Sequence, residues 1–104
     1  MTLRIQKSEE RGWVVLRLTG RIQADLIPEL QALLRSELAD HQVALDLKEV
    51  RLVDLDAVRF LVKSQVEGAT LRHGSAFIRE WISQERNVMQ HAQTESSNGS
   101  RAKG

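Results

Sequence analysis

The spacing of apolar residues changes repeatedly along residues 1–90, and this alternation restricts what the chain can fold into. In the segment WVVLRLTG, Val14, Leu16 and Leu18 alternate with residues that face the opposite way, which is typical of a strand. The next segment, DLIPELQALLRSEL, has apolar residues three and four positions apart, which is typical of a helix. The period of two returns in QVALDL. Alternation of this kind predicts an α/β fold in which helices cover a sheet.

The predicted elements follow one another in the order ββαβαβα. Short strands are expected in LRIQK and ATLRH, and Asp25 and Ser75 are candidate N-caps of the first and last helices. The second helix is expected over residues 57–67, where Gly68 ends it. Its predicted apolar stripe consists of Val58, Leu61, Val62 and Val66. The last helix is expected to have an apolar face made of Phe77, Ile78, Trp81 and Ile82.

The strand QVALDL predicts how the sheet is covered. Val43, Leu45 and Leu47 are expected to face the core, and the residues that alternate with them, Ala44, Asp46 and Lys48, are expected to face out. A strand that is polar on one side is typical of a sheet with one covered face. We therefore predict a mixed sheet of about four strands with helices packed on one face.

The composition fits one compact domain. The chain has 104 residues, of which 41% are hydrophobic, a formal net charge of +1 and no cysteine. No apolar run approaches the roughly 18–20 residues that cross a bilayer, and the segment MTLRIQKSEE has acidic residues where a signal peptide would be apolar. Lys and Arg are interspersed with Asp and Glu. We expect a cytoplasmic protein that neither inserts into a membrane nor binds nucleic acid.

The periodicity ends near residue 90. The segment HAQTESSNGSRAKG has no regular apolar spacing and no large apolar side chains. The sequence therefore predicts a domain over residues 1–90 and a disordered C-terminal tail over residues 91–104.

Two carboxylates, Asp54 and Asp56, lie where the strand in VALDLKEV gives way to the second helix. A carboxylate at a helix start accepts hydrogen bonds from free backbone N–H groups, so Asp56 is a candidate cap of helix 57–67. The segment DLDAV also fits the Asp-x-Asp pattern of Mg²⁺-dependent phosphotransferases. That chemistry needs further acidic ligands and a later lysine. No Asp follows Asp56, and the later lysines are Lys63, in the same helix, and Lys103.

Three stretches, taken with the order of elements, resemble the STAS domain of bacterial anti-sigma factor antagonists. The first is LTGRIQADLIPEL, similar to the family's entry from a strand into its first helix. The second is VALDLKEVRLVDLDAVRFL, similar to a strand followed by Asp-Ser-Ser-Gly-Leu and a helix. The third is GATLRHGSAFIREWI, similar to the late strand and last helix. The resemblance spans roughly residues 3–88.

The resemblance implies a switch that is not an enzyme and needs no cofactor. In that family the domain binds an anti-sigma factor kinase, which phosphorylates a serine at the start of the second helix and so separates the complex. In this chain Asp54 matches the family aspartate, but Leu55, Asp56 and Ala57 replace the two serines and the glycine, and Gln23 replaces an aspartate at the first helix entry. Asp56 is thus the phospho-acceptor equivalent, without a hydroxyl group.

The resemblance therefore predicts a regulatory protein-binding module that lacks the usual serine phosphorylation. The expected partner is an anti-sigma factor or serine kinase-type protein, and the oligomeric state, a homodimer included, stays open. The alternatives are a STAS subunit of a lipid-transport ABC complex and, further off, a Mg²⁺-dependent phosphotransferase that uses Asp54 and Asp56. The binding surface is expected to include Gln23, Asp25, Asp54, Leu55, Asp56, Ala57, Arg59, Phe60 and Lys63.

Overall fold

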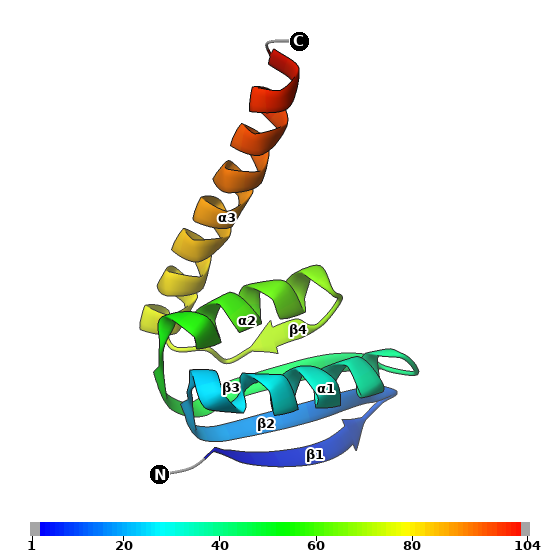
Figure 1. Cartoon of the computed structure of the whole chain (residues 1–104). Coiled ribbons are helices and arrows are strands. Elements are labelled where there is room, and N and C mark those ends of the chain that lie inside the picture. The colour runs from blue at the N-terminus through cyan, green and yellow to red at the C-terminus, as the bar shows by residue number, and fades with distance from the viewer. Residues whose placement is uncertain (1–2, 103–104) are drawn as a thin grey trace.

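The structure, a computed structural model, describes the backbone of residues 3–102 and the side chains of residues 3–89. A four-stranded sheet has its strands in the order β1-β2-β3-β4, and helices lie against it (Figure 1). The elements are β1 (Arg4–Glu10), β2 (Trp13–Ile22), the 3-10 helix η1 (Ala24–Leu26), α1 (Ile27–Leu38), β3 (Gln42–Val53), α2 (Leu55–Val66), β4 (Thr70–Arg72) and α3 (Ala76–Ala102).

The sheet is mixed, as the sequence predicts. β1 and β2 are antiparallel, and Arg11 and Gly12 make the tight turn between them with φ values of 51° and 87°. β2 pairs in parallel with β3, and β3 with β4. Each parallel pair is joined through a helix, α1 or α2, and both helices lie on the same face of the sheet (Figure 1). The predicted α/β class, element order and one-sided covering are therefore confirmed.

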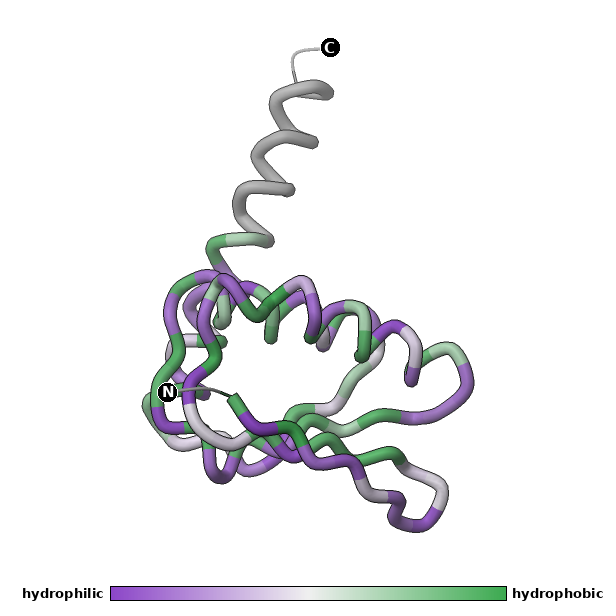
Figure 2. The backbone as a smooth tube through the Cα atoms, turned by 60° about the horizontal axis from the view of Figure 1, so that its bottom comes forward, coloured by the Kyte–Doolittle hydropathy of each residue, from purple (hydrophilic) through white to green (hydrophobic). Residues whose placement is uncertain are grey.

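The core lies between this face of the sheet and the helices. Hydrophobic and hydrophilic residues are interspersed along the chain (Figure 2). The helices and the central strands β2 and β3 bury their apolar side chains in this core, whereas β1 at the sheet edge is exposed over its whole length. The side chains at the centre of the core, all buried, include Leu16, Leu18, Val43, Leu45, Leu47, Leu34, Val58 and Leu61.

Helix α2 is buried over a wider arc than its predicted stripe. Phe60 retains only 3% of its exposure and belongs to the core cluster, whereas Val66 is 82% exposed at the end of the helix. The buried set is Ala57, Val58, Phe60, Leu61, Val62 and Ser64. The arc is wide because α2 packs not only on the sheet but also against α1 and α3. The prediction that Val66 belongs to the buried stripe was wrong, because this last residue of α2 is open to solvent.

The face of the sheet without helices is also closed at its centre. Ala44 is fully buried and Asp46 is 5% exposed, so the outward side of β3 is not open to solvent at these two positions, which the predicted polar side of the strand did not anticipate. Long side chains of neighbouring strands cover this region. The Arg72 guanidinium lies 5.5 Å from the centre of the Trp13 ring, and Arg17 Nε lies 3.7 Å from Asp46 Oδ2.

Helix α3 begins as predicted and extends further than predicted. Ser75 Oγ accepts a hydrogen bond from the Ile78 N–H at 3.2 Å, which makes Ser75 the N-cap. Ile78 and Ile82 are buried, but Phe77 is 68% exposed, so its place on the buried face was wrong. The helix continues to Ala102. The side chains after Met89 lie outside the described residues, and the division of the chain at residue 90 stays a prediction.

Candidate functional site

Asp54 caps α2 and fixes the turn between β3 and α2. Its backbone is extended (φ −105°, ψ −179°), and its Oδ1 accepts a hydrogen bond from the Ala57 N–H at 2.8 Å. The helix therefore begins at Leu55, and Asp56 lies within its first turn. The prediction that Asp56 caps a helix over residues 57–67 was wrong. The cap is the other aspartate, two residues earlier.

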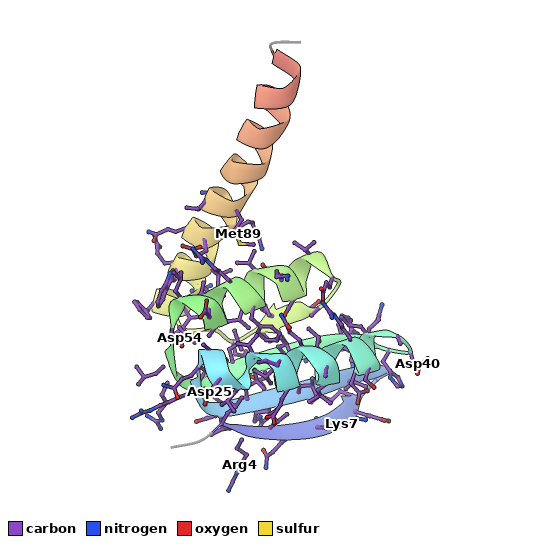
Figure 3. The ribbon with its side chains drawn as sticks, viewed as in Figure 1. Arg4, Lys7, Asp25, Asp40, Asp54 and Met89 are labelled. Atoms are coloured by element: carbon purple, nitrogen blue, oxygen red, sulfur yellow. The ribbon has the colours of Figure 1, made fainter. Side chains whose placement is uncertain are left out.

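The second oxygen of Asp54 fastens a distant loop to the same turn. Asp54 Oδ2 accepts a hydrogen bond from the Ala24 N–H at 3.0 Å. Ile22 and Val53, the last residues of β2 and β3, are paired in parallel, so the chain leaves both strands at the same edge of the sheet. One carboxylate therefore holds the entry to α1 against the entry to α2, and Figure 3 shows Asp25 and Asp54 at this end of the molecule.

The predicted N-cap at Asp25 is not formed. Gln23 occupies the N-cap position of η1 and Leu26 that of α1, and neither makes a side-chain cap hydrogen bond. Asp25 instead lies in the first turn of η1, exposed to solvent, where its charge interacts favourably with free backbone N–H groups.

The structure brings most of the predicted site residues to one surface. Gln23, Asp25, Leu55 and Asp56 are exposed around the two helix entries, and Arg59 and Lys63 continue along the exposed side of α2. Asp54 is half-buried, as its structural role requires. Ala57 and Phe60 are buried at 0% and 3% exposure, so neither can provide a surface anchor. Phe60, which the predicted apolar stripe left out, belongs to the core.

A shallow groove beside this surface includes residues that the sequence did not single out. Its volume is about 260 Å³, and it lies between α1 and α2. Ile27, Pro28 and Gln31 of α1 face Asp56, Arg59 and Lys63 of α2 across it. Ile27 and Gln31 are four residues apart, which is the spacing of one helix face, but only the packing of α1 on α2 shows which face borders the groove.

Leu52 is another residue near this surface that the sequence did not single out. It is 54% exposed at the end of β3, and Leu55 is 39% exposed three residues later. Two exposed leucines flank the half-buried cap residue Asp54, and Asp56 follows them in sequence. Alternation along EVRLVD places Leu52 on the same side as Val50, which is buried, but the pairing of β2 with β3 shifts register between these two residues. A shift of this kind could not be placed from sequence.

The site has one ion pair between helices. Arg59 Nε lies 3.3 Å from Glu85 Oε1 of α3, at the surface, where such pairs contribute little to stability. Asp56 and Lys63 make no ion pair with another residue in the part of the chain whose side chains are described. Their charges are therefore available to a partner.

The geometry favours a structural over a metal-binding role for Asp54. Each of its two carboxylate oxygens already accepts a backbone N–H. Among the described residues, no group of three or more His, Cys, Asp or Glu is arranged to hold a metal ion. The described helices also include none with the length and apolar character of a membrane span.

Comparison with known proteins gives the same fold. The structure is similar to the anti-sigma factor antagonist SpoIIAA in its unphosphorylated form, with a TM-score of 0.64, 14% sequence identity and coverage of 88% of this chain and 98% of that chain. The Bacillus cell fate determinant SpoIIAA in its phosphorylated form gives a TM-score of 0.63 at 15% identity, covering 81% and 83% of the two chains.

A third structure, an anti-sigma factor antagonist from Mycobacterium paratuberculosis, gives a TM-score of 0.60 at 17% identity and covers 67% of this chain and 66% of that chain. No curated protein sequence matches significantly. A family model described as "Mlab, STAS domain" matches residues 5–76, from β1 into the start of α3. The chain therefore belongs to the STAS domain family.

Proposed function

We propose that this chain is a regulatory protein-binding module of the anti-sigma factor antagonist kind, which docks an anti-sigma factor or serine kinase-type protein. The docking surface consists of Gln23, Asp25, Leu52, Leu55, Asp56, Arg59 and Lys63, and is called the entry surface below. It combines exposed leucines with charged side chains of both signs, a mixture that suits a specific, reversible interface. A cytoplasmic location accords with this function and stays a prediction.

The observation that best supports the proposal is the double hydrogen bond of Asp54. It joins residues 30 positions apart in sequence, Ala24 and Asp54, and thereby fixes both helix entries relative to each other. A surface that is already rigid loses little conformational entropy when a partner binds. The two hydrogen bonds of Asp54 support such a preorganised surface.

The proposed module lacks a phosphorylation switch at this turn. Residues 55 and 56 are Leu and Asp, so the start of α2 has no hydroxyl group at either position. Asp56 instead places a permanent negative charge in the first helical turn, where the helix dipole favours it. A phosphate would add a charge of roughly −1.5 to −2 at neutral pH, so a single carboxylate imitates it only in part.

A second candidate function is that of a STAS subunit in a lipid-transport ABC complex. The missing hydroxyl also suits this role, because a subunit of a lasting complex needs no release by phosphorylation at the turn. A Mg²⁺-dependent phosphotransferase is less well supported, because the oxygens of Asp54 are occupied by backbone N–H groups.

The experiment is a pull-down from the native host with three variants of the full chain. Leu55→Arg and Asp56→Arg alter the entry surface, and Asp40→Arg makes the same charge change as Asp56→Arg at the other end of the molecule (Figure 3). We expect the partner captured by the wild type and by Asp40→Arg to be lost from Leu55→Arg and weakened about tenfold in Asp56→Arg.

The identity of the captured protein separates the candidates. An anti-sigma factor or kinase supports the proposal, and a transport ATPase supports the second candidate. Equal capture by all three variants would show that the entry surface is not the docking surface. Saturable Mg²⁺ binding to the wild type that is lost in Asp54→Asn would support the phosphotransferase instead.

A further inference from the structure

A separate cavity lies on the other side of α2, between α2, α3, the middle of β3 and the end of β4. Its volume is about 230 Å³. Leu47, Leu71 and Ile82 give it an apolar wall, and Arg79, Ser83 and Arg86 of α3 give it a polar one. It includes no residue of the entry surface. Any ligand of this cavity is therefore distinct from the proposed protein partner.

The polar wall is formed by one face of α3. Arg79, Ser83 and Arg86 are four and three residues apart, so their side chains project from the same side of the helix. The last residue of this set contacts α2, because the Arg86 guanidinium donates a hydrogen bond to Gln65 Oε1. Gln65 lines the cavity as well, so α2 and α3 both contribute polar groups to it.

The positive charge of these arginines is not neutralised within the described part of the chain. No carboxylate there lies within ion-pair distance of Arg79 or Arg86, and neither Asp nor Glu lines the cavity. Arg59 and Arg72 differ, since each lies within 3.5 Å of a glutamate oxygen. The carboxamide of Gln65 is a neutral acceptor and leaves the charge of Arg86 intact.

The third basic side chain at the cavity is held in place from the sheet. His73 lines the cavity, and its Nδ1 lies 3.2 Å from Oδ1 of the buried Asp46. Its backbone has a φ of 60°, a conformation that non-glycine residues adopt rarely. His73 thus lies at the junction between β4 and α3, with its imidazole against Asp46.

We propose that this cavity binds a small organic anion, a carboxylate or phosphate monoester that has a short apolar group. The anionic group lies between Arg79 and Arg86, whose guanidinium groups donate charge-assisted hydrogen bonds. The apolar group lies on Leu47, Leu71 and Ile82. The cavity is smaller than the roughly 300–1,000 Å³ that encloses a drug-sized ligand, so the ligand has only a short chain.

The test titrates the ¹⁵N-labelled full chain with four probes: hexyl phosphate, hexanoate, inorganic phosphate and hexanol. We expect saturable binding of hexyl phosphate, hexanoate or both, with amide shifts at Leu71, His73 and Ser83. The tighter of the two identifies the anionic group. Inorganic phosphate and hexanol, which each lack one half of the ligand, are expected to bind at least about tenfold more weakly.

Variants then test the arginines. Arg79 and Arg86 are both exposed, and we expect Arg79→Gln and Arg86→Gln each to weaken binding about tenfold. The control is Arg4→Gln, on β1 far from α3 (Figure 3), which we expect to leave binding unchanged. Ser83→Phe keeps both charges and obstructs the cavity, so it is also expected to abolish binding. Each variant is first compared with the wild type by thermal unfolding.

Three outcomes would overturn the proposal. The first is that the wild type binds neither hexyl phosphate nor hexanoate saturably. The second is that Arg79→Gln and Arg86→Gln bind these anions as tightly as the wild type does. The third is that the wild type binds hexanol or inorganic phosphate as tightly as the amphiphilic anions. None of these bears on protein capture by the entry surface, so failure here is distinguishable from failure of the proposed function.

Discussion

Asp54 acts on two parts of the chain through its two carboxylate oxygens. Oδ1 caps α2 by accepting the Ala57 N–H, and Oδ2 accepts the Ala24 N–H from the entry to α1. A helix cap contributes typically about 1 kcal/mol, and an ordinary hydrogen bond about 0.5–1.5 kcal/mol. The two contributions come from different oxygens, so variants can separate them.

Replacing Asp54 by Ala and by Asn should therefore have unequal effects. Asp54→Ala removes both acceptors and is expected to lower the free energy of unfolding by about 2 kcal/mol. Asp54→Asn keeps one carbonyl oxygen for the cap and is expected to lose about 1 kcal/mol. Urea unfolding measures both. The control is Asp56→Ala, which removes no cap and is expected to change stability by less than about 0.5 kcal/mol.

This result would be contradicted if Asp56→Ala were the more destabilising change. The sequence DLD offers two acceptable cap residues two positions apart, and composition cannot choose between them. The backbone makes the choice: Asp54 is extended and Asp56 is helical. For this reason the sequence could predict a capped helix at this turn but not which carboxylate caps it.

Asp46 gives the stability a defined dependence on pH. Burial by itself would raise the pKa of Asp46, but hydrogen bonds from the Lys48 N–H and from His73, together with the charges of His73 and Arg17, outweigh burial and lower the pKa below its ordinary value. A lowered pKa in the folded state means that the ionised carboxylate stabilises the fold.

The contribution of Asp46 is complete above the pKa of the unfolded chain, about 3.9, and is lost as pH falls through the lower pKa of the folded state. We expect urea unfolding between pH 6 and 2.5 to show a loss of stability below about pH 4. In Asp46→Asn this acid-dependent loss should be smaller, whereas in Asp40→Asn it should match the wild type. Equal slopes in Asp46→Asn and wild type would rule out Asp46 as a source of the effect.

At the scale of elements, α2 shows what hydrophobic spacing predicts and what it misses. Spacing predicted a helix with Val58, Leu61 and Val62 inside, and all three are buried. It did not predict Phe60 or Ser64, because the width of the buried arc depends on α1 and α3 as well as the sheet. Ser64 is tolerated there because its Oγ donates a hydrogen bond to the Phe60 carbonyl at 2.8 Å.

Phe60 therefore stabilises the helix layer and is not a partner anchor. Phe60→Ala is expected to lower the free energy of unfolding by about 3–5 kcal/mol, because a large buried side chain is removed. Val66→Ala, on the same helix but exposed, should change it by less than about 0.5 kcal/mol. Thermal and urea unfolding measure both. Phe60→Leu, which keeps most of the volume, should fold and still capture the partner, and a folded variant without capture would restore the anchor interpretation.

At the scale of the whole molecule, hydrophobic periodicity and the family resemblance predicted different features. Alternating periods of two and 3.6 residues predicted the element order, and the polar side of the strand QVALDL predicted that helices cover one face of the sheet. The resemblance to a family predicted Gln23, Asp25 and Asp54 on one surface, and the hydrogen bond from the Ala24 N–H to Asp54 joins the two helix entries where these residues lie. The cavity beside Arg79 could not be predicted, since it depends on how α3 crosses α2 and β4.

The sequence also did not predict that the face of the sheet without helices is closed to solvent at its centre, and the reason is related. Alternation marked Asp46 as outward, and it does point away from the helices. Its burial arises from long side chains on neighbouring elements, Arg17 and His73, that reach across it. A pattern along one strand contains no information on the length of side chains that neighbouring strands place over it.

The extent of the folding unit at its C-terminus provides the last test. Among the residues whose side chains are described, those of α3 that pack on the core are Ile78, Trp81, Ile82 and Met89. If residues 1–90 form the domain, a chain that ends at Gln90 should unfold within about 0.5 kcal/mol of the full chain, because it keeps every one of these contacts. Ile82→Ala in the full chain should lose about 2–5 kcal/mol, which shows that the measurement responds to α3 packing. A loss above about 2 kcal/mol in the shortened chain would place the later part of α3 inside the folding unit.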